Sequence, residues 1–157
     1  FDGRGGAPYG EDATPRPCTA YGRSKAEAER RVLAAHPQAL VVRTSLLVGG
    51  PGVPPSRQEL AARDPEAVFF EDELRSPLQV GDLASALLEL AELDVGGVLH
   101  VAGADGVSRA ELAELVAGRP VRRVPAPAGR PLDCRLDSSR ARALLRTQLR
   151  GVRTVLV

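Results

Sequence analysis

The sequence predicts an α/β fold whose sheet is mainly parallel. Helical and strand patterns alternate along the 157 residues, an order typical of helices packed on parallel strands. The length suits one domain with a moderate core, and 43% hydrophobic with 26% charged residues is the composition of an ordinary globular protein. No apolar run approaches the roughly 20 residues that a membrane helix requires, so no membrane partner is expected.

In the first half of the chain, capping residues and prolines mark where the predicted helices and strands begin and end. Thr19 can cap a helix whose apolar side includes Val32, and His36 followed by Pro37 ends it. The β-branched run that follows is short and apolar, which is typical of a buried strand. The elements predicted here are a helix over 20–35, a strand over 39–44, an irregular loop over 49–55, a short helix over 56–63 and a strand over 67–70.

Two caps organise the second half. Asp82 can cap a helix with leucines along one face. Ser108 and Glu111 can form a capping box, in which each side chain bonds the backbone amide of the other. The elements predicted here are a helix over 83–93, a strand over 97–102, a helix from the capping box to about 117, a strand over 121–124 and a helix over 137–145.

Charge is distributed unevenly between the two ends. Residues 1–118 hold 11 basic and 18 acidic side chains and residues 119–157 hold 10 and 2, a balance of −7 against +8. A basic tail indicates a solvated surface, a site for a phosphate-bearing small molecule or a nucleic-acid interface. We favour the solvated surface. Nucleic acid ranks last, because only 3% of the residues are aromatic and base stacking requires aromatic platforms.

Lysine is almost absent, since 20 of the 21 basic residues are arginine and Lys25 is the exception. A position that tolerated a guanidinium would tend to carry one, so Lys25 is expected where a compact ammonium is needed. Tyr21 lies four residues earlier on the predicted helix, so both side chains share a face. A free phenol has a pKa near 10, and a cation beside it favours the phenolate. The pair is therefore a candidate acid–base centre.

Short motifs are spread along nearly the whole chain. They are FDG at 1–3, PYxEDxxPxP at 8–17, YGxSKxxxE at 21–29, RTS at 43–45, SP and VxDLA within 76–84, GVLHVAG at 97–103 and RPxDxRLD at 130–137. Together they resemble one family, the extended short-chain dehydrogenase/reductases, and are most similar to its dTDP-4-dehydrorhamnose reductases. The segment around the tyrosine and lysine is the most specific part of this resemblance.

The resemblance implies NADPH-dependent reduction of a 4-keto nucleotide sugar, with NADH as the alternative cofactor. Tyr21 would be the proton donor, and Lys25 would lower the pKa of the phenol and bind the cofactor ribose, so both residues contact the cofactor. Leu46 stands where the family often has an aromatic residue against the sugar, so it is a candidate substrate contact. Arg130 is the candidate in the tail for the substrate diphosphate, because its planar guanidinium matches phosphate oxygens, and a structural role is an equal alternative.

The resemblance also implies a division of the chain. Residues 1–48 would end a Rossmann-like domain and carry the tyrosine–lysine helix, and residues 49–157 would form mainly a small substrate-binding α/β region. A dinucleotide fold needs a glycine-rich turn between its first strand and helix, and no such turn is present in this sequence. The N-terminal cofactor-binding half is therefore expected to precede Phe1, and the isolated chain is expected to be inactive.

Two other functions stay open at this point. The chain could belong to a non-catalytic NADP-binding regulatory subunit of the same family, or to another extended short-chain enzyme such as a sugar-nucleotide epimerase or dehydratase. Only the motif at 130–131 favours the reductase.

Three further properties are expected from the sequence. A cytoplasmic location is the default in the absence of a signal peptide. Cys18 and Cys134 are expected to be free thiols, and a homodimer is left open.

The remaining polar residues are expected to be structural. His100 lies within an apolar strand, where a histidine with satisfied hydrogen bonds is more common than a ligand. The acidic run at 71–73 is expected to be solvated, so no metal is predicted there. Glu27 and Glu29 are expected to pair on the helix surface with the neighbouring arginines of the same helix.

Overall fold

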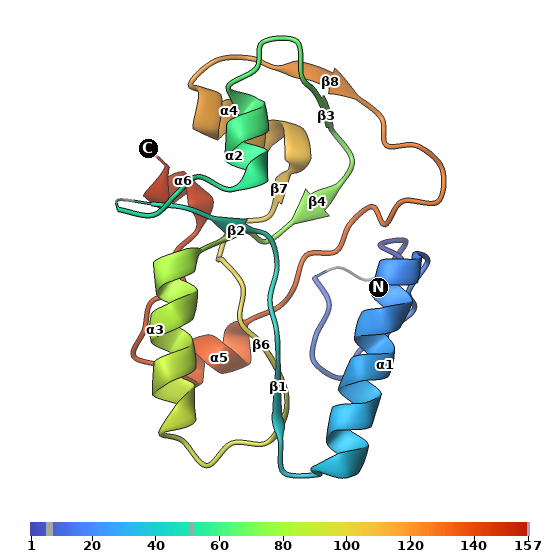
Figure 1. The fold of residues 1–157 in the computed structure, drawn as a ribbon, viewed down its shortest axis with the longest axis vertical. Coiled ribbons are helices and arrows are strands. Elements are labelled where there is room, and N and C mark those ends of the chain that lie inside the picture. Colours follow the sequence, from blue (N-terminus) through green and yellow to red (C-terminus); the bar gives the residue numbers. More distant parts are fainter. Residues whose placement is uncertain (6–7, 51, 157) are drawn as a thin grey trace.

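The computed structural model describes residues 1–5, 8–50 and 52–156. Six helices and eight strands are defined in these ranges (Figure 1). The helices are α1 (Ala20–Ala35), α2 (Arg57–Ala62), α3 (Val80–Ala91), α4 (Arg109–Ala117), α5 (Ser139–Leu144) and α6 (Val152–Val155). The strands are β1 (Leu40–Arg43), β2 (Leu47–Val48), β3 (Val68–Phe70), β4 (Leu74–Arg75), β5 (Leu78–Gln79), β6 (Gly97–His100), β7 (Val107–Ser108) and β8 (Arg122–Val124).

The strands form four pairs, of which three are parallel. The longest is β1 with β6, in a register that places Leu40 opposite Gly97 and Arg43 opposite His100. Strand β2 pairs with β5 and β3 with β8, both in parallel, and β4 with β7 is the antiparallel pair. The predicted α/β fold with mainly parallel pairing is confirmed.

Two groups of elements pack around separate apolar clusters. The first group contains β1, β6, α3 and α5, and its buried side chains include Leu90, Leu99 and Ala141; α1 lies beside β1 and adds no side chain to this cluster (Figure 1). The second contains the short strands with α2, α4 and α6, and its two clusters centre on Leu112 and Phe69. The groups interleave along the chain, because α3, β6 and α5 of the first group follow strand β2 of the second group in sequence. The division near residue 48 stays a prediction.

Helix α1 and strand β1 are only partly covered. No residue of α1 is buried, and Val32 on its expected apolar side is 44% exposed. All four residues of β1 are partly exposed. The prediction of a buried strand was wrong, because β1 pairs with β6 alone among the described strands and parallel strands become buried only when both neighbours and both faces are covered.

Helix ends follow their caps closely. Thr19 caps α1 by accepting a hydrogen bond from the Gly22 amide at 3.0 Å, and α4 opens with the predicted Ser108–Glu111 capping box. Helix α3 starts earlier than predicted, at Val80, because the Gln79 side chain caps it. The proposed cap, Asp82, instead directs its carboxylate to Arg150 at 2.7 Å. No helix in the described part of the chain is long and apolar enough to span a membrane.

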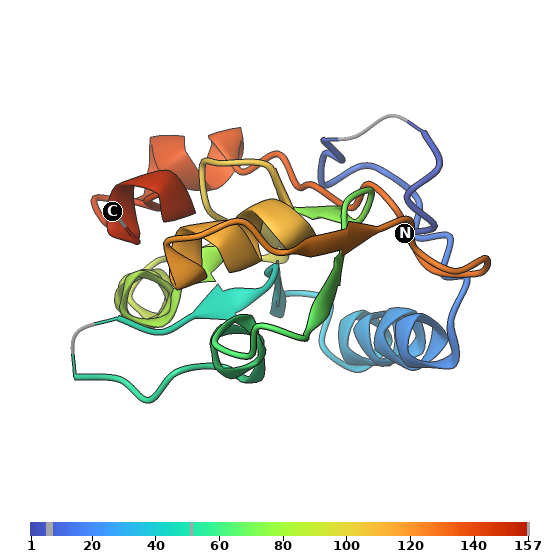
Figure 2. The same cartoon turned by 90° about the horizontal axis from the view of Figure 1, so that it is seen from above.

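Serine side chains hold the C-terminal segment against the two groups. Ser76 accepts a hydrogen bond from the Leu136 amide at 3.2 Å, and Ser138 accepts one from the Ala102 amide at 3.0 Å. Ser45, which follows β1, accepts one from the Ser76 amide at 3.1 Å. In both views, the segment between β8 and α5 passes the N-terminal end of α1 (Figures 1 and 2). This path brings the closing motif of the sequence close to the tyrosine–lysine helix.

Candidate active site and a buried arginine cluster

The structure places Tyr21 and Lys25 together at the start of α1. The Lys25 ammonium lies 5.5 Å from the centroid of the Tyr21 ring. Tyr21 is 73% exposed and Lys25 is also exposed, so both polar groups are open to a ligand. Among the described residues, no carboxylate lies within ion-pair distance of the ammonium. The Thr19 cap starts the helix just before the tyrosine, which fixes both residues in its first two turns.

The two glutamates of α1 behave differently. Glu27 bonds Arg30 and Arg31 on the helix surface, as predicted, and these hydrogen bonds lower the pKa of Glu27 to about 2. Glu29 does not pair on the helix. Its carboxylate bonds Arg43 of β1, with the closest contact at 2.8 Å from Nη2, so the expectation of a surface pair within the helix was wrong. This contact ties α1 to β1.

His100 is fully buried and held in one tautomer. Its Nε2 lies 3.3 Å from Nη1 of Arg43, and because a guanidinium only donates, Nε2 accepts. Its Nδ1 lies 3.1 Å from the carbonyl oxygen of Tyr9, so this nitrogen carries the proton and donates. Burial lowers the pKa of His100, and the charge of Arg43 acts in the same direction. The prediction of a structural histidine with satisfied partners is confirmed.

We expect the stability of the chain to fall as pH drops below about 6.5, the ordinary pKa of histidine. The unfolded chain takes up a proton there, whereas folded His100, with its lowered pKa, stays neutral. The free energy of unfolding should therefore decline by up to about 1.4 kcal/mol per pH unit. Urea unfolding at several pH values measures this slope. His100→Gln should flatten it and His36→Gln, at the exposed end of α1, should not; equal slopes in all three proteins would refute the assignment.

A second charged site surrounds Glu73, whose side chain is only 1% exposed. Arg130 bonds both of its oxygens, Arg75 lies 3.7 Å away and Arg109 lies 3.8 Å away. Arg75 is also anchored to backbone carbonyls, including that of Leu132 at 2.6 Å. Three guanidiniums face one carboxylate, so the cluster carries an excess of two positive charges. The expectation of a solvated acidic run was wrong for Glu73, because the neighbouring Arg75 and two guanidiniums distant in sequence, those of Arg109 and Arg130, enclose it.

The structure separates the four predicted site residues into different settings. Tyr21 and Lys25 lie together, whereas Arg130 belongs to the Glu73 cluster, with its guanidinium 4.7 Å above the Phe70 ring. Leu46 is half-buried against the apolar cluster that contains Leu112. No hydrogen bond or ion pair within the described ranges joins Arg130 or Leu46 to the tyrosine–lysine pair. Their roles in substrate binding stay predictions.

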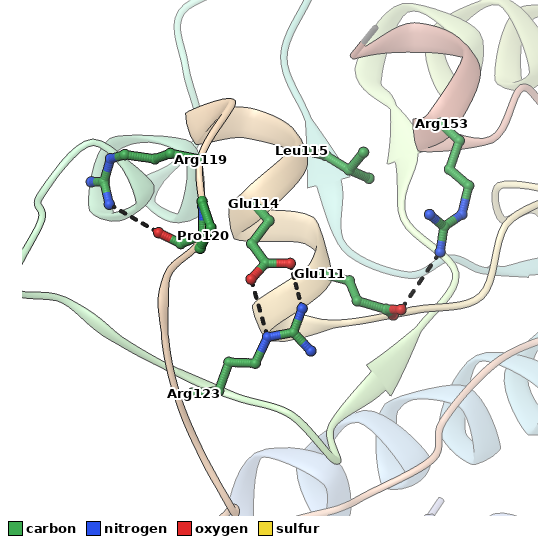
Figure 3. Close-up of a pocket in the computed structure, with 7 residues that line it drawn as sticks. All are labelled: Glu111, Glu114, Leu115, Arg119, Pro120, Arg123 and Arg153. Carbon is green, nitrogen blue, oxygen red and sulfur yellow. Dashed lines mark hydrogen bonds and ion pairs between the residues drawn. The ribbon is translucent and has the colours of Figure 1, made fainter.

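The arginines of the basic tail are at least partly exposed to solvent, and most of them also form ion pairs. Six of these ten arginines form ion pairs with carboxylates of residues 1–118, at distances of at most 3.7 Å. Two of these pairs, Arg123 with Glu114 and Arg153 with Glu111, line a hollow beside α4 (Figure 3). The favoured interpretation of a solvated arginine surface was therefore incomplete, since the opposite charges of the two ends largely neutralise each other within the fold.

The fold is that of the C-terminal part of a Rossmann-like α/β protein. The family model described as the RmlD substrate binding domain matches residues 1–157, and the chain belongs to this family. It is 38% identical over 164 residues to the dTDP-4-dehydrorhamnose reductase of Mycolicibacterium smegmatis, a match that covers 95% of this chain and 50% of the relative. The chain thus spans about half the length of this curated relative.

Solved structures give the same assignment. A hypothetical dTDP-4-dehydrorhamnose reductase from Sulfolobus tokodaii superposes with a TM-score of 0.79 at 34% identity, covering 96% of this chain and 56% of that chain. A dTDP-4-dehydrorhamnose reductase from Bacillus anthracis, solved in complex with NADP, superposes with a TM-score of 0.81 at 25% identity and covers 99% of this chain and 60% of that chain. The family inferred from the motifs is confirmed.

Proposed function

We propose that this chain is the substrate-side half of an enzyme that reduces a 4-keto nucleotide sugar with NADPH, or with NADH. The observation that carries the proposal is the exposed Tyr21–Lys25 pair, in a chain whose relatives are reductases of this kind. The Tyr21 hydroxyl donates its proton to the carbonyl oxygen as that oxygen becomes an alcohol. The Lys25 ammonium stabilises the phenolate that is left, because an adjacent cation favours the charged form.

The residues present fit one part of a nicotinamide cofactor. The Lys25 ammonium is exposed and has hydrogens available for a ribose hydroxyl, so it would hold the nicotinamide end beside Tyr21. When bound, the cofactor supplies the hydride. No glycine-rich phosphate turn occurs in the sequence, so the pyrophosphate would be held by a cofactor-binding half like that of the relatives. The boundary near residue 48 is part of the same proposal.

The Glu73 cluster supports an anionic substrate. The excess of positive charge in this cluster suits a nucleoside diphosphate. Arg130 is the most exposed of the three arginines, with a side chain that is 44% exposed. Arg130 bonds Glu73 and stacks on Phe70, so its fork is already oriented when the diphosphate arrives. Leu46 lies in the segment after β1 and would meet the sugar from the side of the tyrosine–lysine helix.

The proposal predicts NADPH oxidation by the complete enzyme when a dTDP-4-keto sugar is added. Arg130→Gln should raise the KM for the sugar nucleotide by one or two decades, about 1.4–2.8 kcal/mol. Glu73 keeps two cationic neighbours in this variant, so the fold should survive. Arg123→Gln, which removes a tail arginine paired with Glu114 outside the cluster, is the matched control. An unchanged KM would make Arg130 structural, and a wild-type enzyme without turnover would refute the reductase function.

A further inference from the structure

One stripe of α1 carries three functional groups at helical spacing. Tyr21, Lys25 and Glu29 are each four residues apart, so their side chains lie one above another on the same face. A lysine and a glutamate at this spacing are neighbours on the helix surface and can form an ion pair. Such a pair would occupy the ammonium that the proposed function assigns to the tyrosine and the cofactor. The structure does not show it.

Glu29 forms its ion pair with Arg43 instead of Lys25. The Nε of Arg43 lies 3.1 Å from both oxygens of Glu29 and its Nη2 lies 2.8 Å from one of them. The two side chains are only 13% and 23% exposed, whereas Lys25 is open to solvent. His100 accepts from Nη1 on the other side, and the Phe1 ring lies 5.5 Å from the guanidinium. The arginine is thus held by two other segments, at His100 and Phe1, in addition to its contact with the helix.

We infer that Arg43 is a positioning residue that holds Glu29 away from Lys25 and so keeps the ammonium available for Tyr21 and the cofactor. The planar guanidinium of Arg43 bonds both carboxylate oxygens in a bidentate arrangement, which matches the carboxylate geometry better than the point charge of an ammonium. The contact that holds Glu29 on Arg43 is a property of the folded chain. Its importance for catalysis rests on the proposed function.

Two substitutions separate this role from simple anchoring. Arg43→Gln and Glu29→Gln both break the ion pair between α1 and β1, so a purely structural role predicts the same consequence for each. They differ in one respect. Arg43→Gln frees a carboxylate four residues from Lys25, whereas Glu29→Gln removes that carboxylate.

The readout is the rate at which a dilute amine-acylating reagent modifies Lys25, the one lysine of the chain. It is followed on the peptide that contains Lys25, because an α-amino group reacts as well. Free N-acetyl-lysine in the same tube is the reference. Arg43→Gln should slow acylation up to about twofold, the effect of one exposed ion pair at this spacing. Glu29→Gln should keep the wild-type rate, and Arg43→Gln combined with Glu29→Gln should restore it. If Arg43→Gln does not fold, the acylation rate of Arg43→Met is compared instead, because methionine keeps a similar side-chain volume.

Equal rates in the two single variants, or a double variant as slow as Arg43→Gln, would overturn the inference. The assay needs no cofactor, so its outcome is independent of whether the complete enzyme reduces a sugar. In the complete enzyme, Arg43→Gln should raise the KM for NADPH and lower kcat, and the added Glu29→Gln should recover part of both. A structural defect would worsen with the second substitution rather than recover.

Discussion

Replacing Tyr21 by phenylalanine is expected to lower the kcat of the complete enzyme by roughly 10²–10⁴, the usual contribution of a positioned general acid. The change removes one oxygen and keeps the ring. Because Tyr21 is 73% exposed and buries little apolar surface, the free energy of unfolding should change by less than about 0.5 kcal/mol. Steady-state kinetics and urea unfolding of the same preparation measure both quantities.

The other tyrosine provides the matched control. Tyr9 is 9% exposed and its hydroxyl makes one long hydrogen bond, 3.4 Å to Asp2. Tyr9→Phe should therefore keep turnover within a few-fold of wild type. Similar losses of kcat in Tyr21→Phe and Tyr9→Phe, or a Tyr21→Phe enzyme with normal turnover, would remove Tyr21 from the chemistry.

Replacing Glu73 by glutamine is expected to destabilise the chain by about 3 kcal/mol, the range found when one partner of a buried ion pair is lost. The amide keeps the volume of the side chain but leaves Arg75, Arg109 and Arg130 facing one another without a compensating charge. Burial lowers the pKa of Arg109, and the charge of Glu73 acts in the opposite direction. Urea unfolding at neutral pH measures the change.

A surface pair separates this effect from the loss of any negative charge. Glu66 contacts Arg122 at 3.4 Å, with both side chains more than half exposed, so Glu66→Gln should change stability little. A Glu73→Gln chain as stable as Glu66→Gln would contradict the view that the carboxylate holds the cluster together.

Local signals in the sequence were sufficient to locate the candidate catalytic helix. The cap at Thr19 and the proline after His36 define α1 to the residue, and the Ser108–Glu111 box defines the start of α4. These signals act within one helical turn, so they need no knowledge of the tertiary fold. The spacing of four residues between Tyr21 and Lys25 is local in the same sense.

The Glu73 cluster could not be found in this way. Its closest partner, Arg130, is 57 residues distant along the chain, and the short strands that bring the residues together contain two residues each in β4 and β7. Strands of that length show no hydrophobic period. Their position depends on tertiary contacts, among them the anchoring of Arg75 to backbone carbonyls.

The partner of Glu29 was missed for a different reason. Arg30 and Arg31 are one and two residues away from Glu29, and residues at these spacings do not face each other on a helix. The same two arginines are three and four residues from Glu27, which they do bind. Helical geometry alone therefore excluded a surface pair for Glu29, although it could not identify Arg43 as the partner.

The central claim, that the lone lysine is present for chemistry, is tested most directly by a double-mutant cycle on the complete enzyme. It compares kcat for wild type, Tyr21→Phe, Lys25→Arg and the combination. Lys25→Arg keeps the charge but replaces a compact ammonium with a planar fork, so turnover should fall almost as far as in Tyr21→Phe. The combined loss should be much smaller than the product of the single losses, because the residues act as one unit. A Lys25→Arg enzyme with near-normal turnover, or strictly multiplicative losses, would contradict the claim.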